Sequence, residues 1–261
     1  MTDPAAATIP RAALVTGAGR RIGRAIALDL AGAGWAVGVH HRPGNGAEAQ
    51  GVVAEITAAG GQAVALSADL AREADVEALV PAAVRALGPL GLLVNNASVF
   101  EEDDAASATR ASWDRHIETN LRAPLVLTQA FAKSLPAGSR GQVINILDQR
   151  VLNLTPHFLS YTVSKSALWT LTRTLALALA PSIRVNGIGP GPVLPNPRQS
   201  EASFAEQWQD VPLQRPVPLA DICAAVRFLI DAESATGQII VLDGGEHLGW
   251  AFPPAGFVPT G

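Results

Sequence analysis

The chain has 261 residues, of which 48% are hydrophobic and 16% are charged. This length and composition are enough for one domain with a large core. The formal net charge of −4 provides no basic surface, so neither nucleic acid nor an anionic membrane is expected as a partner.

The cysteine count and the apolar segments indicate a compartment. Cys223 is the single cysteine, so no disulfide can form within the chain, which suits a reducing environment. Residues 1–10 lack the basic start and long apolar stretch of a signal peptide and are expected to be flexible. The longest apolar helix candidate, Ala167–Ala180, is interrupted by Arg173 and is too short to span a bilayer. These features predict a soluble cytoplasmic protein.

Short apolar runs alternate with helical patterns along the chain. Strands are expected at Ala12–Thr16, Ala36–His40, Ala63–Leu66, Leu92–Asn95, Val143–Leu147, Ile183–Asn186 and Gln238–Leu242. Helices are expected around Ile22, Ile26 and Leu30, and over Gly46–Ala59, Asp75–Leu87, Trp113–Phe131, Tyr161–Ala180 and Leu219–Ile230. The strands lack a clean polar–apolar alternation, which is typical of parallel strands buried on both faces. The pattern predicts a single doubly wound α/β domain over residues 1–261, with a seven-stranded parallel sheet flanked by helices.

Two segments fall outside this alternation. Residues 190–218 are rich in proline, and a loop of that length in a compact domain is usually a lid or a binding loop, so we expect it to contact the substrate. The tail, residues 246–261, contains Trp250, Phe252 and Phe257. We expect this apolar tail to pack on a neighbouring subunit or over a pocket.

A glycine-rich turn follows the first expected strand and opens a helix. Its residues are Thr16, Gly17, Ala18, Gly19, Arg20, Arg21, Ile22 and Gly23. Glycines let the backbone approach a pyrophosphate, and the helix N-terminus supplies N–H donors and a positive dipole. In a strand–turn–helix context this motif predicts dinucleotide binding.

The end of the second strand indicates which dinucleotide binds. An NAD site commonly places Asp or Glu there to hold the ribose 2′-hydroxyl. This chain has His40, His41 and Arg42 at that point, and Arg20 and Arg21 lie in the facing turn. Such a cluster attracts a 2′-phosphate, whereas a carboxylate would repel it. The expected cofactor is therefore NADPH/NADP+.

Tyr161 and Lys165 form the first catalytic candidate. They are four residues apart, so on a helix they share one face with about 5–6 Å between their Cβ atoms. An ammonium group that close favours the phenolate and lowers the tyrosine pKa from about 10. The phenol would then be a usable proton donor near neutral pH.

Several motifs occur together in the order and spacing of one enzyme family. They are TGAGRRIG, Asp69-Leu70, Asn95-Asn96-Ala97, Asn120, YTVSK and Pro190-Gly191. From Arg11 to Gly245 the chain thereby resembles the short-chain dehydrogenase/reductase family. The resemblance implies a Rossmann-type subunit, usually in a homotetramer.

The resemblance also implies roles for individual residues. Tyr161 is the implied acid, Lys165 holds the nicotinamide ribose and tunes Tyr161, and Asn120 supports a proton-relay water. Asp69 is the implied adenine contact, and Asn96 lies along the cofactor. Further cofactor contacts are implied at Leu70, Ala97, Ser98, Pro190, Gly191 and Val193.

The informative departure from the family lies thirteen positions before Tyr161, where Asp148 stands. The family usually has Ser there, and its hydroxyl polarises a substrate carbonyl. A carboxylate beside a ketone oxygen would oppose the developing negative charge. It suits a substrate whose reacting atom is a ring nitrogen that needs a proton, because it can hydrogen-bond the tyrosine hydroxyl or relay the proton.

Asp148 and three further features resemble the pteridine reductase branch, which includes bacterial dihydromonapterin and dihydrofolate reductase-like members. These features are an arginine before Ile22-Gly23, His41-Arg42, and Asn96-Ala97-Ser98-x-Phe100. The resemblance implies that Arg21 reaches the cofactor phosphates and the pterin, and that Ser98 lies near both. Phe100 would sandwich the pterin against the nicotinamide. The alternative for Phe100 is that it only packs within its loop. The alternative for Asp148 is that the residue has drifted in an inactive relative of the family.

Other polar residues are assigned no chemistry. The acidic run Glu101–Asp104 is expected to be a solvated loop rim. His116, His157 and His247 show no metal-ligand spacing, so no metal site is expected.

The sequence thus predicts an NADPH-dependent reductase acting on a C=N bond of a pterin-like substrate of the dihydropteridine, dihydromonapterin or dihydrofolate type. Tyr161, assisted by Asp148 and Lys165, would protonate the nitrogen. One alternative is a carbonyl reductase of the same family, acting on a 3-oxoacyl or sugar-like ketone. Another is a non-catalytic NADP(H)-binding regulator, against which the intact Tyr161 and Lys165 pair argues.

Overall fold

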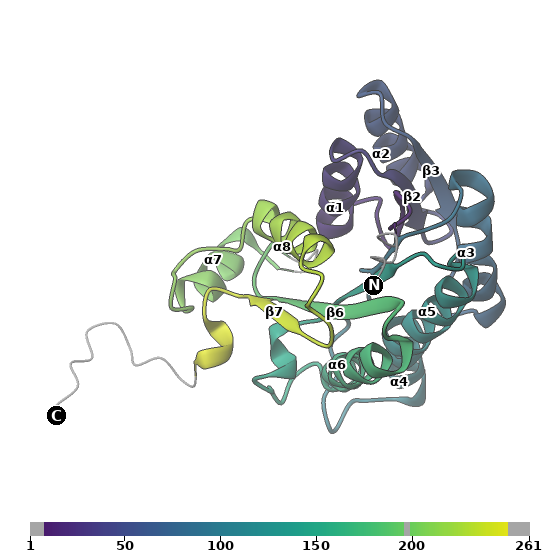
Figure 1. Ribbon diagram of the computed structural model, residues 1–261. Coiled ribbons are helices and arrows are strands. Elements are labelled where there is room, and N and C mark those ends of the chain that lie inside the picture. The colour runs from purple at the N-terminus through teal and green to yellow at the C-terminus, as the bar shows by residue number, and fades with distance from the viewer. Residues whose placement is uncertain (1–7, 196–198, 250–261) are drawn as a thin grey trace, which may run out of the picture.

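A seven-stranded parallel sheet forms the central layer, as predicted (Figure 1). The computed structural model describes residues 8–195 and 199–249. The strands are β1 (Ala12–Val15), β2 (Ala36–His41), β3 (Ala63–Ser67), β4 (Leu92–Asn95), β5 (Gly141–Ile146), β6 (Ile183–Pro190) and β7 (Ile239–Leu242). They lie in the order β3-β2-β1-β4-β5-β6-β7.

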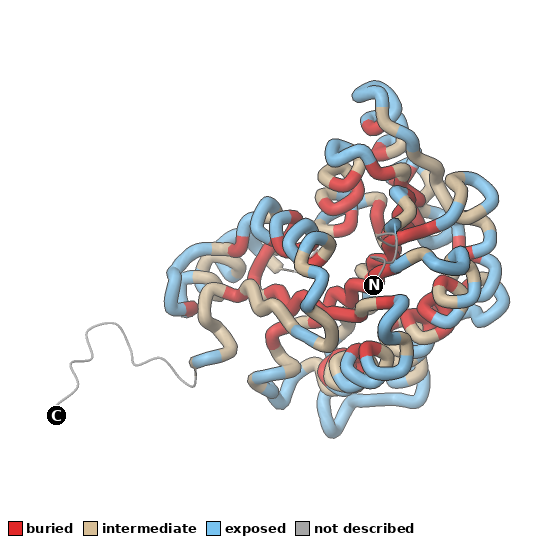
Figure 2. The backbone as a smooth tube through the Cα atoms, in the orientation of Figure 1, coloured by how far each residue is buried: buried red, intermediate tan, exposed pale blue. Residues whose placement is uncertain are grey.

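Helices cover both faces of the sheet. One face carries α1 (Arg21–Gly32), α2 (Gly46–Ala58) and α8 (Leu219–Asp231), and the other carries α3 (Glu73–Leu87), α5 (Ala123–Ser134) and α6 (Leu159–Leu179). Within β1, Ala13 and Val15 join the first core cluster while Ala12 and Leu14 join the second. Successive strand residues therefore bury apolar surface on opposite faces, and the buried residues follow the sheet in Figure 2.

The strand order indicates where a ligand would bind. β1 pairs with β2 on one side and with β4 on the other, so the chain reverses its direction of travel across the sheet at the carboxyl ends of β1 and β4. In open α/β sheets, ligands bind in the crevice at such a switch point. The glycine-rich turn follows β1 and Asn96 follows β4, so both motifs lie at this edge.

Two expected elements differ from prediction. The helix predicted over Trp113–Phe131 is α4 (Arg110–Ile117), a π-helical turn η1 (Glu118–Arg122) and then α5. The π turn carries Asn120, and such insertions occur frequently at functional sites. The segment 190–218 is not wholly irregular, because it contains α7 (Glu201–Gln209), which Ser200 caps by accepting from the Ser203 N–H at 3.1 Å.

The two chain ends are described only in part. Residues 1–7 and 250–261 lie outside the described residues, so the expected flexible N-terminus and most of the apolar tail are not described. The start of the tail, Glu246–Leu248, forms a short 3-10 helix, η3. Among the described residues, no helix is both long and apolar enough to cross a membrane.

Candidate active site at the carboxyl edge of the sheet

The glycine-rich turn is clamped against the end of β4. Gly17 adopts a φ of 63°, a conformation that favours glycine. A Cβ on Gly23 would lie 2.3 Å from the Gly17 carbonyl oxygen and 2.5 Å from Asn96 Nδ2, so only glycine fits there. Asn96 Nδ2 in turn donates to the carbonyls of Thr16 at 2.8 Å and Gly17 at 3.2 Å. These contacts hold the turn open as an anion-binding backbone cradle at the start of α1.

This cradle fits the phosphates of a dinucleotide, and Arg42 is placed to extend it. Arg42 follows β2 and is exposed, and it makes no ion pair or side-chain hydrogen bond with any part of the chain that the structure describes. Its guanidinium is therefore available to a phosphate on the adenosine ribose. His41 is half-buried beside it, with Nδ1 3.0 Å from the Arg42 carbonyl oxygen.

His40 does not have the cationic role predicted for it. Its Nδ1 accepts from the Gly17 N–H at 3.0 Å, and Nε2 lies 3.1 Å from the Ala68 carbonyl, which can only accept. Burial lowers the pKa of His40 to about 4, so the ring is neutral with its proton on Nε2. His40 is a structural bridge between β2, the turn and the end of β3, and the prediction that it binds phosphate as a cation is wrong.

The two turn arginines point in different directions. Arg20 lies 3.7 Å from Glu48, with both side chains largely exposed. Arg21 has a φ of 54°, and its guanidinium donates to the carbonyls of Pro195 at 2.6 Å and Leu194 at 3.1 Å. Arg21 thus joins the glycine-rich turn to the start of the segment 190–218.

The remaining expected cofactor residues border the same edge. Asp69 follows β3, where its Oδ1 accepts from the Ala71 N–H at 3.1 Å, and Leu70 is buried. Ala97 donates its N–H to Thr16 Oγ1 at 3.0 Å. Gly191 follows β6, and Val193, two residues further on, is buried. A Cβ on Gly191 would lie 2.6 Å from the Cβ of Asp243 and 3.0 Å from Glu246 Oε2, so the backbone passes closely between these groups.

Tyr161 and Asp148 form a direct pair. The Tyr161 hydroxyl donates to Asp148 Oδ2 at 2.8 Å, and Asp148 Oδ1 accepts from the Arg150 N–H at 2.9 Å. Tyr161 is in the first turn of α6, and Asp148 precedes the 3-10 turn η2 (Gln149–Val151) after β5. The carboxylate thus stands where it can exchange a proton with the phenol.

Lys165 lies one helical turn below Tyr161, as predicted. Its Nζ is 5.8 Å from the Tyr161 ring centroid and donates to the Ile146 carbonyl at 2.7 Å. Burial lowers the pKa of Lys165 to about 8, while the charge of Asp148 opposes that shift. An ammonium group has three donors, so two remain for the hydroxyls of a ribose.

The predicted decrease of the tyrosine pKa is not observed. Burial raises the pKa of Tyr161 well above its ordinary value, and the charge of Asp148 and its hydrogen bond raise it further. The cation of Arg150 is an opposing influence. The expectation failed because spacing on a helix shows Lys165 but not the burial of the phenol or the position of Asp148.

Asn120 is a positioning residue in this structure. Its Oδ1 accepts from the Val99 N–H at 2.8 Å and from Ser98 Oγ at 3.2 Å. Its Nδ2 donates to the Val99 carbonyl at 3.0 Å and to Ser164 Oγ at 3.0 Å. The amide's usual capacity is therefore filled, and the side chain ties the loop after β4 to α6. The relay water expected at Asn120 stays a prediction.

Phe100 takes part in an aromatic cluster beside the catalytic pair. Its ring stacks on Phe158 at a centroid distance of 4.3 Å and an interplanar angle of 8°, and meets the edge of Tyr161 at 4.7 Å. The Arg150 guanidinium lies 5.4 Å from the Phe100 centroid and 5.1 Å from that of Phe158. One face of Phe100 is used in this packing, which leaves at most the other for a substrate ring.

Asp103 does not belong to a solvated rim, contrary to prediction. It is buried and accepts from the Ser160 N–H at 2.9 Å, from Ser160 Oγ at 2.6 Å and from Ser112 Oγ at 2.9 Å. Burial raises its pKa, but these hydrogen bonds outweigh that effect and hold the pKa below its ordinary value. Asp103 thereby anchors the first turn of α6, one residue before Tyr161.

Three residues near the catalytic pair were not predicted from the sequence: Phe158, Arg150 and Glu246. Phe158 precedes α6 in the left-handed conformation and stacks on Phe100, so helical spacing does not indicate it. Arg150 is two residues from Asp148. Because Asp148 departs from the family pattern, its neighbours were candidates for the same site. Nothing in the sequence around Glu246 indicates its role, because Asp148 and Arg150, which act on it, lie far away in the chain.

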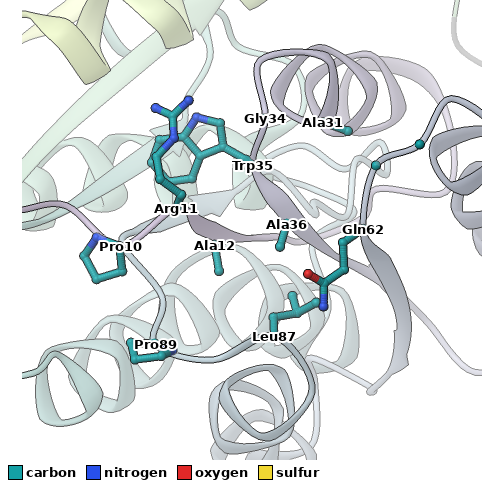
Figure 3. Close-up of a pocket in the computed structure, with 12 residues that line it drawn as sticks. Pro10, Arg11, Ala12, Ala31, Gly34, Trp35, Ala36, Gln62, Leu87 and Pro89 are labelled. Carbon is teal, nitrogen blue, oxygen red and sulfur yellow. The ribbon is translucent and has the colours of Figure 1, made fainter.

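Two other features carry none of this chemistry. Within residues 8–195 and 199–249, no group of three or more His, Cys, Asp or Glu side chains could hold a metal. A hollow of about 460 Å³ lies at the opposite edge of the sheet, beside the starts of β1 and β2 (Figure 3). There the guanidinium of Arg11 lies over the Trp35 ring at 4.7 Å and donates to the Ala33 carbonyl at 2.6 Å.

Comparison with known sequences identifies the family. The family model described as short chain dehydrogenase matches residues 11–206. The chain belongs to this family of oxidoreductases. A curated relative, an uncharacterised oxidoreductase from Methylorubrum extorquens, is 37% identical over 90% of this chain and 97% of its own length. A 3-oxoacyl-(acyl-carrier-protein) reductase from Staphylococcus epidermidis is 32% identical over 91% of this chain and 99% of its own.

Solved structures of short-chain dehydrogenases include close matches. The FolM alternative dihydrofolate reductase 1 from Brucella canis, complexed with NADP, has a TM-score of 0.90 and 46% identity over 95% of this chain and 98% of its own. The protein of the same name from Brucella suis, also in complex with NADP, has a TM-score of 0.89 and 47% identity, over 96% of this chain and 99% of its own. The predicted Rossmann-type fold is thereby confirmed.

Proposed function

We propose that this short-chain dehydrogenase is an NADPH-dependent reductase that acts on a C=N bond of a pterin-like substrate, of the dihydropteridine, dihydromonapterin or dihydrofolate type. The observation that carries the proposal is the 2.8 Å hydrogen bond from the Tyr161 hydroxyl to Asp148 Oδ2. A carboxyl group at this point can relay a proton from solvent to the phenol, but while ionised it cannot donate a hydrogen bond to a ketone oxygen.

Charge separates this reaction from carbonyl reduction. In carbonyl reduction negative charge develops on oxygen, and catalysis needs donors aimed at that atom. Asp148 would place a negative charge beside it. In imine reduction the nitrogen gains a proton, and a phenol backed by a carboxylate is a suitable acid–base pair.

Other features support the cofactor and the direction of proton flow. The cradle formed by the turn, Gly23 and Asn96 suits a pyrophosphate. Arg42 is exposed and makes no ion pair with a described residue, which suits a 2′-phosphate. NADPH, when bound, supplies the hydride that the C=N carbon accepts. Tyr161 gives its proton to the adjacent nitrogen, and Asp148 can then relay a second proton from solvent to the phenolate. The likeness to the two FolM reductases, each complexed with NADP, supports the same assignment.

The carbonyl reductase alternative rests on the 32% identity to the staphylococcal 3-oxoacyl reductase. The test is a panel of dihydropterins, dihydrofolate, 3-oxoacyl thioesters and sugar-like ketones, with NADPH consumption as the readout and NADH as the comparison cofactor. We expect dihydropterin reduction with NADPH to have the highest kcat/KM. Reduction of ketones without any reduction of dihydropterins would overturn the proposal. Tyr161→Phe is the control, and it should abolish turnover that uses this site.

A further inference from the structure

Arg150 places a cation beside Asp148 and Tyr161. Its backbone N–H binds Asp148 Oδ1 at 2.9 Å, and its guanidinium lies against Phe100 and Phe158. The Nε atom is buried without a hydrogen-bond partner, and the guanidinium makes no ion pair with any described residue. Protein atoms enclose Nε, but the guanidinium carries further N–H donors. An acceptor on a ligand that meets one of those donors would form a charge-assisted hydrogen bond.

Glu246 brings a carboxylate within electrostatic reach of Asp148 and Arg150. It lies in η3, after β7, and its Oε2 is 3.0 Å from the position that a Cβ on Gly191 would occupy. The amide of Asn153 donates to the Gly249 carbonyl at 2.6 Å, which ties η3 to the segment after η2. No described residue donates a side-chain hydrogen bond to Glu246. Burial raises the pKa of Glu246 to about 7, the charge of Asp148 adds to this shift, and the cation of Arg150 opposes it.

The donors and acceptors that these groups offer complement one edge of a pterin. The Arg150 guanidinium lies on the ring of Phe100, which meets the edge of Tyr161 at 4.7 Å. The hydrogen bond from Asn153 to Gly249 ties η3, which carries Glu246, to the segment after η2, which carries Arg150. In a dihydropterin, ring nitrogen 5 and the 4-oxo group point the same way from the fused rings. The 3-NH and 2-amino groups follow next around the ring. Nitrogen 5 accepts the proton, the 4-oxo group accepts a hydrogen bond, and the 3-NH and 2-amino groups donate hydrogen bonds.

We propose that Arg150 and Glu246 select substrates with a 2-amino-4-oxopyrimidine edge. Arg150 donates to the 4-oxo oxygen while Tyr161 protonates nitrogen 5, and Glu246 accepts from the 3-NH and 2-amino groups. Two parallel hydrogen bonds to one carboxylate are strong and geometrically selective. This inference rests on the proposed function and assigns its substrate recognition to two residues that do not transfer the hydride or the proton.

The test compares two substrates that differ at one group. The first is a 7,8-dihydropterin, and the second is the 7,8-dihydrolumazine with the same side chain, in which an oxo group replaces the 2-amino group. Glu246 has acceptors for both donors of the pterin but would face the 2-oxo oxygen of the lumazine. In Glu246→Gln, the amide oxygen accepts from the 3-NH and the amide N–H donates to the 2-oxo oxygen.

We expect Glu246→Gln to raise KM for the dihydropterin about tenfold and to lower it for the dihydrolumazine, with kcat for the pterin within about threefold of wild type. Arg150→Met should raise KM for both substrates about 10- to 100-fold, the loss expected for a hydrogen bond from a charged group. Arg150→Lys should recover only part, because it lacks the planar fork. The exposed α3 residues provide the matched controls Glu77→Gln and Arg85→Met, which should change nothing.

The possible failures are distinguishable. If the wild-type protein reduces dihydropterin but Glu246→Gln leaves the ratio of the two substrates unchanged, the recognition proposal is wrong and the proposed function stands. If the wild-type protein neither binds nor reduces dihydropterin, both are wrong. Thermal unfolding of each variant identifies a loss of folding. If Arg150→Met does not fold, the ratio measured with Glu246→Gln still decides the matter.

Discussion

Replacing Asp148 with serine separates the two candidate reactions. The carboxylate accepts from the Tyr161 hydroxyl at 2.8 Å and from the Arg150 N–H at 2.9 Å. Serine has one oxygen on a shorter side chain and cannot make both contacts. Because a positioned proton-transfer partner is typically worth about 10²–10⁴-fold in rate, kcat for dihydropterin should fall by that factor. Ketone reduction should hold steady or improve, because a negative charge leaves the vicinity of the carbonyl oxygen.

The assay is NADPH consumption with one dihydropterin and one ketone, measured across pH for the wild-type protein, Asp148→Ser and Asp148→Asn. The asparagine variant keeps the size of the side chain and an acceptor for Arg150 but loses the charge. Since the charge of Asp148 helps raise the pKa of Tyr161, both variants should lose activity at a lower pH than wild type as the phenol ionises. Undiminished dihydropterin reduction by Asp148→Ser would refute the reasoning and favour the carbonyl reductase.

Three further predictions concern cofactor choice, assembly and pH. Arg42→Asp should weaken NADPH binding far more than NADH binding, and equal kcat/KM for the two cofactors in the wild-type protein would contradict the assignment. Light scattering at micromolar concentration should give the mass of a homotetramer, and a monomer of 27.0 kDa would exclude this assembly. Deletion of residues 249–261 should reduce the stability of the oligomer or the affinity for substrate. The pKa of Glu246 is raised from 4.5 to about 7 on folding, so its ionisation costs stability that grows from pH 4.5 to 7 and stays lost above. Glu246→Gln should therefore raise the Tm by a few degrees at pH 8 and by little at pH 5, and a pH-independent difference would contradict this.

The sheet, the glycine-rich turn and the pairing of Tyr161 with Lys165 could be predicted because their signals are local. Four consecutive apolar residues in β1 are buried on both faces, as a run without alternation indicates. The glycine at position 23 is required by contacts within its own turn and with Asn96. Tyr161 and Lys165 share a helix face by spacing alone.

The environment of each polar group could not be predicted, because it depends on residues distant in the chain. His40 looks like a phosphate-binding cation in sequence, yet the Gly17 N–H and the Ala68 carbonyl make it a neutral bridge. Asp103 looks like part of an acidic rim in sequence, yet it is buried and accepts a hydrogen bond from Ser160, 57 positions away. In both cases burial and a hydrogen-bond partner, rather than residue type, decide the role.

The surroundings of Tyr161 also decide how readily it releases its proton. Burial and Asp148 make the phenol a weaker acid than the spacing from Lys165 suggested, while Arg150 opposes them. A proton will therefore leave Tyr161 most readily when a positive charge stands beside it and the accepting nitrogen lies close. A substrate whose oxo group binds Arg150 would have its neighbouring ring nitrogen at the phenol, so the cation that orients the substrate would also ease the proton transfer. On this reasoning Arg150→Met should raise the pKa of Tyr161 further, in the direction opposite to the Asp148 variants.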